Sequence, residues 1–408
     1  MKCRHCDNRL KYEFLDLGVS SPSNSFIKKE NLNLPEKSFP LRVMVCDTCS
    51  LVQTEGFVNA SEMFTNEYAY FSSYSSSFLN HTKEYVDKMV SKFSLDENSS
   101  VLEVASNDGY LLNFVKKLNI KCLGVEPTKS TADVARSKGL EIIGDFFSTN
   151  LAKKIAKDKN TVDLAIANNV LAHVPNINDF VKGFYEILNP EGVATFENPH
   201  LLELANGKQF DTIYHEHFSY LSLTSVNEIF KNNGLTIFDV EKIPVHGGSL
   251  RYYAQKSDTG RRFISKRVNA LLKEERDAGL TNLAFYRNFQ KVAEIIRDEF
   301  KNFLIEQKNN GKLIAGYGAA AKGNTLLNFC NISKALLQFI VDKNPMKQGL
   351  YCPGSKIPIL DEKKIREEKP DFIVIFPWNI KDEIIDQLKF TKKWGCKFVV
   401  AIPSLSII

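Results

Sequence analysis

The sequence predicts an α/β protein in which a cysteine-rich N-terminal module precedes two Rossmann-like domains. Three observations support this fold class. Four cysteines pair near the N-terminus, short apolar runs alternate with helical patterns in the middle of the chain, and the same alternation returns in the last third. Such alternation implies parallel, doubly wound sheets that bind ligands at the carboxyl ends of their strands. Because 408 residues exceed one hydrophobic core, we expect domains at 1–65, 66–258 and 259–408.

The N-terminal module carries two C-x2-C pairs, "CRHC" with Cys3 and Cys6 and "CDTC" with Cys46 and Cys49. Each pair places two thiolates on one tight turn, and two pairs fill the four corners of a tetrahedral zinc site. Such a site leaves no coordination position open, so the zinc is structural. We therefore expect a zinc module that positions the segment after it.

Composition and charge exclude several classes of protein. The chain is 43% hydrophobic and 25% charged, and its net charge of +5 is spread over interspersed acids and bases. Residues 7–45 hold no dense Lys or Arg stripe, so we expect no nucleic-acid partner. The N-terminal "MKCRHCDNRL" lacks the apolar stretch of a signal peptide, and no run of 18 apolar residues suggests a membrane span. We expect a cytoplasmic protein, in which clustered cysteines stay reduced and bind metal.

The middle domain begins with the apolar run "SVLEVASN" (100–107), and "DGYLLNFVKK" continues with helical spacing. Further predicted strands are "IKCLGVEPT", "LEIIGDFF", "VDLAIANN" and "GVATFENP". Their polar ends, which include Glu126, should meet at one edge of the sheet. An acid after the second strand can accept both ribose hydroxyls of an adenosine, which suits NAD and S-adenosylmethionine (SAM) alike.

The loop after the first strand separates these two cofactors. NAD needs G-x-G-x-x-G, which lets a pyrophosphate approach the backbone. "EVASNDG" has one glycine and two acids, which repel a pyrophosphate and suit a cationic sulfonium. The loop resembles that of class I SAM-dependent methyltransferases, and Asp145 and Phe146 fall where such enzymes hold adenine. We expect the cofactor to contact Tyr68, Ser73, Glu103, Ala105, Asn107, Asp108, Gly109, Leu111, Glu126, Pro127, Asp145, Phe146, Phe147, Asn168 and Asn169.

The segment "NEYAYFSSYSSSFLNH" (66–81) is rich in tyrosine and serine. It is either a surface linker followed by a serine-capped helix or an active-site lid whose hydroxyls face a polar substrate. The residue pattern leaves both interpretations open.

The segment "TIYHEHF" (212–218) contains the most reactive cluster of side chains. The spacing differs from that of a zinc protease, which needs H-E-x-x-H on a helix. A place in the hydrophobic core is also not favoured, because four polar side chains in a row are rarely all buried. General acid–base chemistry remains, with His217 titrating near neutral pH and Glu216 beside it. His173, at the end of the fourth strand, is either a second candidate or a helix-cap residue. His246 precedes two glycines that indicate either close approach to a substrate or a tight turn.

The last third begins with two amphipathic helices in 260–310 and continues as strand, glycine loop and helix in "KLIAGYGAAAKGNTLLNF". Asp342 ends the next strand, 24 residues after Gly318, as an NAD site would require. However, the loop lacks the third glycine, and Lys322 within it suits a phosphate. A nucleotide-binding domain, an NAD site and a degenerate scaffold all remain open.

The ordered motifs resemble one family. Paired cysteine knuckles, "YxYxSSxSxxF", "ExxSNDG", "NVLAHVPN", "YHEHF", "PVHGGSLRY" and "GYGAAAKGNTLLNF" cover essentially the whole chain. The sequence resembles the three-domain deoxysugar C-methyltransferases, including that of D-tetronitrose biosynthesis. The resemblance implies that SAM methylates C3 of a nucleotide-linked 4-keto-deoxysugar. It also implies that the C-terminal domain helps to hold the sugar nucleotide. We expect the protein to be a monomer or a homodimer.

The resemblance also implies roles for individual side chains. A carbon acceptor has no lone pair, so a base must remove the proton alpha to the ketone. His217 is the expected base, and Glu216 orients it or shares the role. Tyr214, His173 and one tyrosine of "YAY", either Tyr68 or the favoured Tyr70, would donate hydrogen bonds to the enolate oxygen. Substrate contacts are expected from His246, Gly247, Gly248, Tyr317, Gly318, Ala319, Lys322 and Asn324.

One position departs from the family pattern, because His215 replaces an acid between the tyrosine and the glutamate. Two other functions are weighed against C-methylation. An O- or N-methyltransferase would need no base for an alpha carbon. An RNA methylase would need a basic groove, which the spread charge does not favour.

Overall fold

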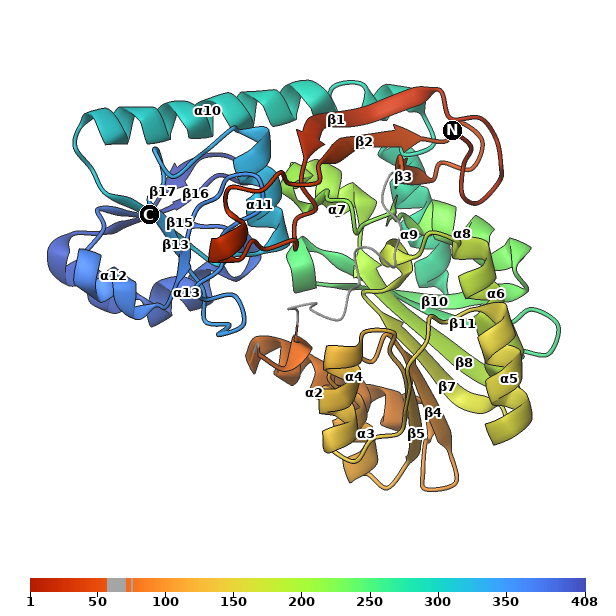
Figure 1. Cartoon of the computed structure of the whole chain (residues 1–408). Coiled ribbons are helices and arrows are strands. Elements are labelled where there is room, and N and C mark those ends of the chain that lie inside the picture. The colour runs from red at the N-terminus through yellow and green to blue at the C-terminus, as the bar shows by residue number, and fades with distance from the viewer. Residues whose placement is uncertain (57–70, 75) are drawn as a thin grey trace.

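The computed structural model of the protein describes residues 1–56, 71–74 and 76–408, and their arrangement is shown in Figure 1. The N-terminal sheet contains β1 (Tyr12–Ser20), β2 (Phe39–Val45), β3 (Val52–Thr54) and β9 (Ser219–Tyr220) in that order. All its neighbours are antiparallel. The last strand comes from the middle of the chain, directly after the 212–218 segment, so the two regions share one sheet.

The central sheet has seven strands in the order β10-β11-β8-β7-β4-β5-β6. They are β4 (Ser100–Val104), β5 (Lys121–Val125), β6 (Ile142–Ile143), β7 (Val162–Asn168), β8 (Leu188–Pro199), β10 (Leu235–Ile243) and β11 (Ser249–Lys256). The strands from β4 to β8 are parallel, as the sequence predicts. By contrast, β11 runs antiparallel to both of its neighbours, so the sheet is mixed at one edge.

Helices cover both faces of this sheet. One core contains residues of α2 (Ser76–Phe93), α3 (Leu112–Lys117) and α4 (Lys129–Ser137), and the other contains residues of α5 (Thr149–Lys159), α6 (Ile177–Ile187), α8 (Leu223–Asn232) and α9 (Lys266–Asp277). Along β4, Leu102 and Val104 face one core and Val101 the other, as the two-residue period of a strand requires. This arrangement of helices on both faces places the loops that follow the parallel strands at the carboxyl edge of the sheet.

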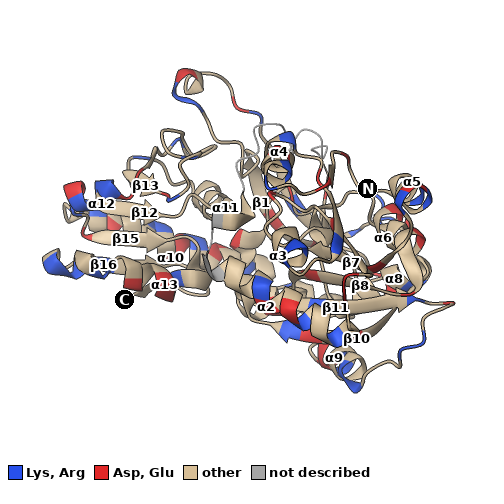
Figure 2. Ribbon diagram, turned by 90° about the horizontal axis from the view of Figure 1, so that it is seen from below, with Lys and Arg blue, Asp and Glu red and all other residues tan. Residues whose placement is uncertain are grey.

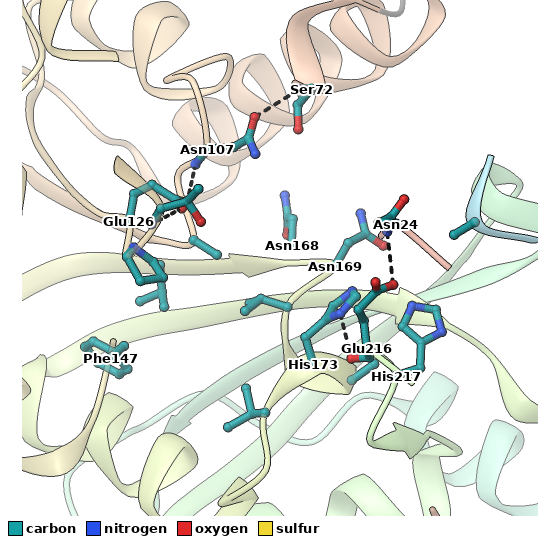
Figure 3. A pocket seen from close by; sticks show the side chains of 18 of the residues that line it. Asn24, Ser72, Asn107, Glu126, Phe147, Asn168, Asn169, His173, Glu216 and His217 are labelled. Carbon is teal, nitrogen blue, oxygen red and sulfur yellow. Dashed lines mark hydrogen bonds between the residues drawn. The ribbon is translucent and has the colours of Figure 1, made fainter. Parts of the chain in front are cut away.

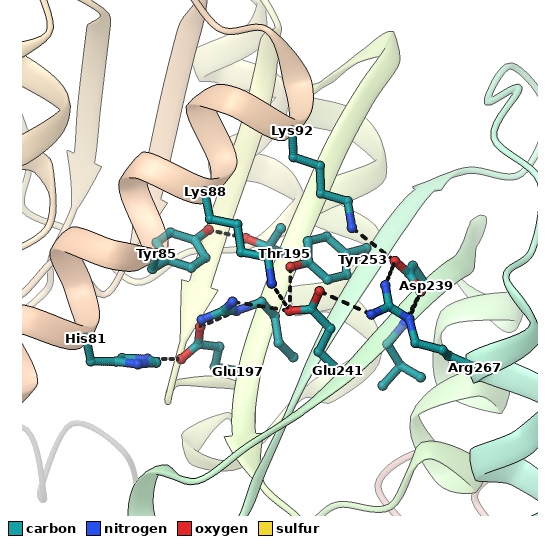
Figure 4. A network of polar contacts seen from close by, with 12 residues as sticks. His81, Tyr85, Lys88, Lys92, Thr195, Glu197, Asp239, Glu241, Tyr253 and Arg267 are labelled. Atoms are coloured by element: carbon teal, nitrogen blue, oxygen red, sulfur yellow. Dashed lines mark hydrogen bonds and ion pairs between the residues drawn. The ribbon is translucent and has the colours of Figure 1, made fainter.

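A polar network attaches α2 to the sheet (Figure 4). Glu197 on β8 is 1% exposed and accepts from His81 at 3.0 Å and from Arg251 at 2.6 Å. Arg251 also lies 3.4 Å from Glu241, which pairs with Lys88 at 2.6 Å. Buried charges are tolerated only when paired in this way. The network fixes α2, which begins within the tyrosine- and serine-rich segment (66–81).

The C-terminal sheet has the order β14-β13-β12-β15-β16-β17. Its strands are β12 (Ile314–Tyr317), β13 (Phe339–Val341), β14 (Ile359–Leu360), β15 (Phe372–Ile375), β16 (Lys397–Val400) and β17 (Ser406–Ile407), of which the last is antiparallel. The helices of this part are α11 (Ala321–Phe329), α12 (Lys363–Glu368) and α13 (Lys381–Gln387). The predicted second Rossmann-like sheet is therefore present.

The long helix α10 (Phe289–Asn309) runs from the C-terminal sheet along β1 (Figure 1). One continuous core includes residues of β1 and β2, of α7 (Leu201–Asn206), of α10 and of the C-terminal sheet. The N- and C-terminal parts thus pack against each other, and the segment that precedes β9 shares their core.

Figure 2 shows acidic and basic residues both scattered over the outer helices, as their interspersed order in the sequence predicts. Among the helices that the structure describes, none is both long and apolar enough to cross a bilayer.

Candidate active site

The four predicted cysteines come together in the N-terminal module. Their Sγ atoms lie within 4.8 Å of one another, and the shortest separations are 3.6 Å for Cys3–Cys49 and 3.5 Å for Cys6–Cys46. A tetrahedron with Zn–S bonds of about 2.3 Å has sulfur separations of about 3.8 Å. The donor set and its spacing therefore fit a closed, structural zinc site. The amide of Gln53 donates to Cys3 Sγ at 3.2 Å and supports the thiolate.

The zinc knuckle is hydrogen-bonded directly to the 212–218 segment. Arg4, between the first two cysteines, donates to the carbonyls of Thr54 at 2.6 Å and Phe218 at 3.1 Å, and its guanidinium lies 5.2 Å from the Phe218 ring. Thr54 Oγ1 donates to the carbonyl of His217 at 3.2 Å. The module thus holds a segment that is distant from the cysteines in the chain. The residues that directly follow the module, 57–70, lie outside the described residues, so the positioning expected for them stays a prediction.

A cavity of about 760 Å³ opens at the carboxyl ends of β4, β5 and β7 (Figure 3). Its walls come from all three parts of the chain. Asn24 belongs to the N-terminal part, most lining residues to the central part, and Ala320, Ala321, Lys322 and Lys347 to the C-terminal part. One cavity therefore joins the predicted cofactor residues to the predicted catalytic residues.

The loop after β4 and the end of β5 form one half of the cavity. Ala105, Asn107 and Gly109 have φ values of 58°, 48° and 74°, so the loop is a tight, left-handed turn. The Glu126 carboxylate accepts from the backbone N–H groups of Asn107 and Thr128, each at 2.9 Å. A carboxylate can accept about four hydrogen bonds, so Glu126 can hold ribose hydroxyls beside these two N–H groups.

Eight of the predicted cofactor residues line the cavity: Ala105, Asn107, Glu126, Pro127, Phe146, Phe147, Asn168 and Asn169. Other predicted residues shape the loop from outside. Asp108 accepts from Ser73 and pairs with Lys138 at 3.5 Å, and Gly109 leaves room for Leu140. Glu103 lies on β4 on the same face as Val101, and burial there raises the pKa of its carboxyl. Leu111 is buried, Asp145 is exposed, and Tyr68 lies outside the described residues.

The 212–218 segment forms the other half of the cavity. His217 is 8% exposed, and its Nδ1 lies 3.0 Å from the carbonyl of Thr212. Because a carbonyl can only accept, Nδ1 carries the proton and Nε2 holds the lone pair. Burial and nearby His173 lower the pKa of His217 well below its usual value, so the imidazole is neutral at neutral pH. A neutral imidazole with a defined lone pair is a proton acceptor.

Glu216 lies beside His217 on the same wall (Figure 3). Its Oε2 accepts from Asn24 Nδ2 at 3.0 Å, and burial raises the pKa of its carboxyl to about 7. The Thr212 carbonyl accepts from Nδ1 of His217 and fixes the orientation of that ring. The expectation that Glu216 orients His217 or shares its role stays a prediction. Glu216 is therefore available as a second titrating group.

His173 and Tyr214 flank His217. The ring centroids lie 4.6 Å apart for His173–His217 and 4.0 Å apart for Tyr214–His217. His173 Nδ1 donates to the Glu216 carbonyl at 2.9 Å, which places its Nε2 lone pair as in His217. Tyr214 and His173 both line the cavity. Tyr70 lies outside the described residues.

Of the predicted substrate residues, His246 and Lys322 line the cavity. The other predicted substrate residues do not line the cavity and are packed or bonded within the protein, so their contact with substrate stays a prediction. Cβ atoms at Gly247 and Gly248 would clash with Trp378 and Glu203, and a Cβ at Gly318 would clash with Pro377. Tyr317, Ala319 and Asn324 bond to Glu362, Asp342 and Ser23, respectively.

The features that suggested NAD in the C-terminal part are used within the protein. Asp342 accepts from the N–H groups of Ala319 and Asn344, each at 2.8 Å, and lies 3.7 Å from Lys347 Nζ. Asn24 and Lys347 line the cavity although no motif pointed to them. Each stands in a loop without a catalytic pattern, so long-range folding alone brings it to the site.

Comparisons with known proteins cover the chain from end to end. Sequence profiles described as a zinc binding domain, a methyltransferase domain and a C-methyltransferase C-terminal domain match residues 3–64, 78–240 and 244–403. The C-methyltransferase NovU of Streptomyces niveus is 32% identical over 407 residues, which are 100% of this chain and 96% of that protein.

Solved structures resemble part of the chain. A SAM-dependent methyltransferase from Clostridium acetobutylicum is 14% identical, with a TM-score of 0.35, over 44% of this chain and 92% of the other. The magnesium protoporphyrin IX methyltransferase of Synechocystis, solved with bound SAH, is 14% identical, with a TM-score of 0.36, over 44% of this chain and 83% of the other.

Proposed function

We propose that this chain, which belongs to the C-methyltransferase family, methylates C3 of a nucleotide-linked 4-keto-deoxysugar. The family membership makes it a SAM-dependent enzyme with a zinc-binding domain. The observation that carries the proposal is the neutral His217, which shares one cavity with the loop around Asn107 and Glu126. A carbon acceptor has no lone pair until its proton is removed, so a base in this cavity is what C-methylation requires.

In the proposed reaction, SAM bound by the β4 loop and Glu126 supplies an electrophilic methyl group. His217 Nε2 removes the proton from the carbon alpha to the ketone, and the electron pair of that C–H bond forms the enolate. Tyr214 donates to the enolate oxygen and stabilises the charge that develops there, whereas His173, whose Nε2 carries a lone pair, packs beside His217. The enolate carbon would then take the methyl group as the bond between that methyl group and the sulfonium sulfur breaks and S-adenosylhomocysteine leaves. His217 would then release the proton to water.

We assign the nucleotide to the C-terminal wall of the cavity. Lys322 and Lys347 line this wall together with His246. Lys322 Nζ donates to Asn379 at 2.7 Å and lies 4.3 Å from the Trp378 ring, which holds the cation in place. Cations at fixed positions suit the diphosphate of a nucleotide-linked sugar.

The test is methyl transfer from carbon-13-labelled SAM to a panel of nucleotide-linked 4-keto-sugars, read by proton–carbon NMR. We expect a labelled methyl group bonded to C3 of at least one sugar. A methyl group on oxygen would contradict the enolate mechanism. Failure with every sugar of the panel, while labelled SAM still binds, would contradict the assigned substrate class.

Glu126→Gln tests the assignment of the cofactor half. The substitution removes the charge that accepts the ribose hydroxyls, and hydrogen bonds to a charged group are worth about 1.5–3 kcal/mol. We expect the Kd for SAM, measured by calorimetry, to rise about 10- to 100-fold. Glu141→Gln is the matched control, since Glu141 is exposed and pairs with Lys159 away from the cavity. Equal affinity of both variants would refute the assignment.

A further inference from the structure

A loop of the N-terminal part contributes a side chain to the catalytic wall. Asn24 stands between β1 and the short helix η1 (Lys29–Asn31), 192 positions before Glu216 in the sequence. It lines the cavity, and its Nδ2 donates to Glu216 Oε2 at 3.0 Å (Figure 3). The Asn24 amide is therefore the side-chain donor that the carboxylate meets at the cavity wall.

The Asn24 loop is held by the helix α11 of the C-terminal part. Asn324 Nδ2 donates to the carbonyl of Ser23 at 2.7 Å, and the hydroxyls of Ser23 and Thr325 lie 3.3 Å apart. Thr325 Oγ1 also bonds to the carbonyl of Ile213 at 3.0 Å, at the start of the catalytic segment. These groups are buried, so α11 fixes the donor and the acceptor relative to each other.

We propose that Asn24 is a positioning residue that holds the Glu216 carboxylate in its ionised form beside His217. This inference rests on the proposed function, because it assigns a role in the same proton transfer. An N–H group that donates to a carboxylate stabilises its charged form. The donor also fixes which oxygen of the Glu216 carboxylate faces His217. An ionised Glu216 would stabilise the imidazolium that forms when His217 takes the substrate proton.

The groups around Glu216 determine which of them titrates. His217 is its neighbour in the chain, His173 bonds to its backbone carbonyl, and Tyr220 lies on β9, while Lys322 and Lys347 line the same cavity. Burial lowers the pKa values of both histidines and raises that of Tyr220.

Glu216, whose pKa burial raises to about 7, is therefore the group expected to change charge near neutral pH. Since the ionised form is the active one, activity is low below this pKa and rises as pH increases through it. Loss of the Asn24 donor must move this rise to higher pH, because the Glu216 carboxyl then stays protonated up to a higher pH.

Asn24→Ala is the test, with Asn24→Gln as the variant that retains an amide donor. A hydrogen bond to a charged group is strong enough to move a pKa by about one to two units. We expect the pH profile of kcat for Asn24→Ala to shift upward by that amount. Its activity should be about 5- to 50-fold below wild type at pH 7 and should recover to about half of the wild-type value or more by pH 9. Asn24→Gln should recover part of the shift, and Ser25→Ala, an exposed neighbour, should match wild type.

A second measurement separates this inference from the proposed function. In protein labelled with carbon-13 at glutamate Cδ, the resonance lost in Glu216→Gln reports the titration of Glu216 without any substrate. Asn24→Ala should raise that pKa even if the assigned sugar is wrong. An unchanged Glu216 pKa, or a loss of activity that is equal at every pH in a variant that folds normally, would overturn the role of Asn24.

Discussion

Replacing His217 with asparagine is expected to lower methyl transfer to the keto-sugar by about 10²- to 10⁴-fold. The variant keeps a polar side chain but has no imidazole to accept the substrate proton. SAM binding should be unchanged, since Glu126 and the β4 loop form the other half of the cavity. A second readout is exchange of the C3 proton in deuterium oxide with S-adenosylhomocysteine bound, which wild type should catalyse and the variant should not.

His215→Asn is the matched control for this prediction. His215 stands two positions away, does not line the cavity, and its Nε2 bonds to the carbonyl of Phe39 at 3.2 Å. We expect it to exchange the C3 proton and transfer methyl within a few-fold of wild type. If the two variants lose activity equally, or if His217→Asn still exchanges the proton, His217 is not the base.

Loss of zinc is expected to disable the enzyme although the metal lies outside the cavity. Structural zinc sites contribute a large share of the folding free energy of small modules. Cys46→Ser should release the metal, lower the Tm by about 10 °C, and lower kcat because Arg4 and Thr54 no longer fix the His217 backbone. Metal analysis, calorimetry and the methyl-transfer assay check the three effects.

Cys122→Ser controls for the loss of a thiol, since Cys122 is half-buried on β5 and outside the cluster. It should keep one zinc per chain and nearly full activity. A Cys46→Ser protein that lost zinc yet kept its kcat would show that the module does not position the catalytic segment.

Local patterns in the sequence predicted most of the fold and half of the site. The paired cysteines, the strand ending at Glu126 and the loop around Asn107 each carry their signal within a few residues. A strand that leads into a polar turn is readable because period and turn chemistry are local. The mixed edge of the central sheet was not readable, since strand direction depends on connections that residue periodicity does not encode.

The rest of the site depends on contacts between distant segments. Asn24 and Lys347 stand in loops whose composition is typical of any surface, and only packing brings them to the cavity. Gly247, Gly248 and Tyr317, whose motif suggested substrate contact, are not among the residues that line the cavity. Their conformations and bonds instead form the seam with Trp378, Glu203 and Glu362. A motif marks residues that matter together, without separating those that touch a ligand from those that build the wall.

The pairing of β3 with β9 determines how this protein can be recombined. A chimera that takes residues 1–65 from one relative and the remainder from another divides a single sheet, and it also separates Thr54 from His217 and Asn24 from Glu216. The catalytic wall therefore combines segments 1–54 and 212–220 with His173, which bonds to the Glu216 carbonyl, and with α11, which bonds to Ser23 and Ile213. Segments joined in this way must be exchanged together if a recombined protein is to keep the geometry around His217.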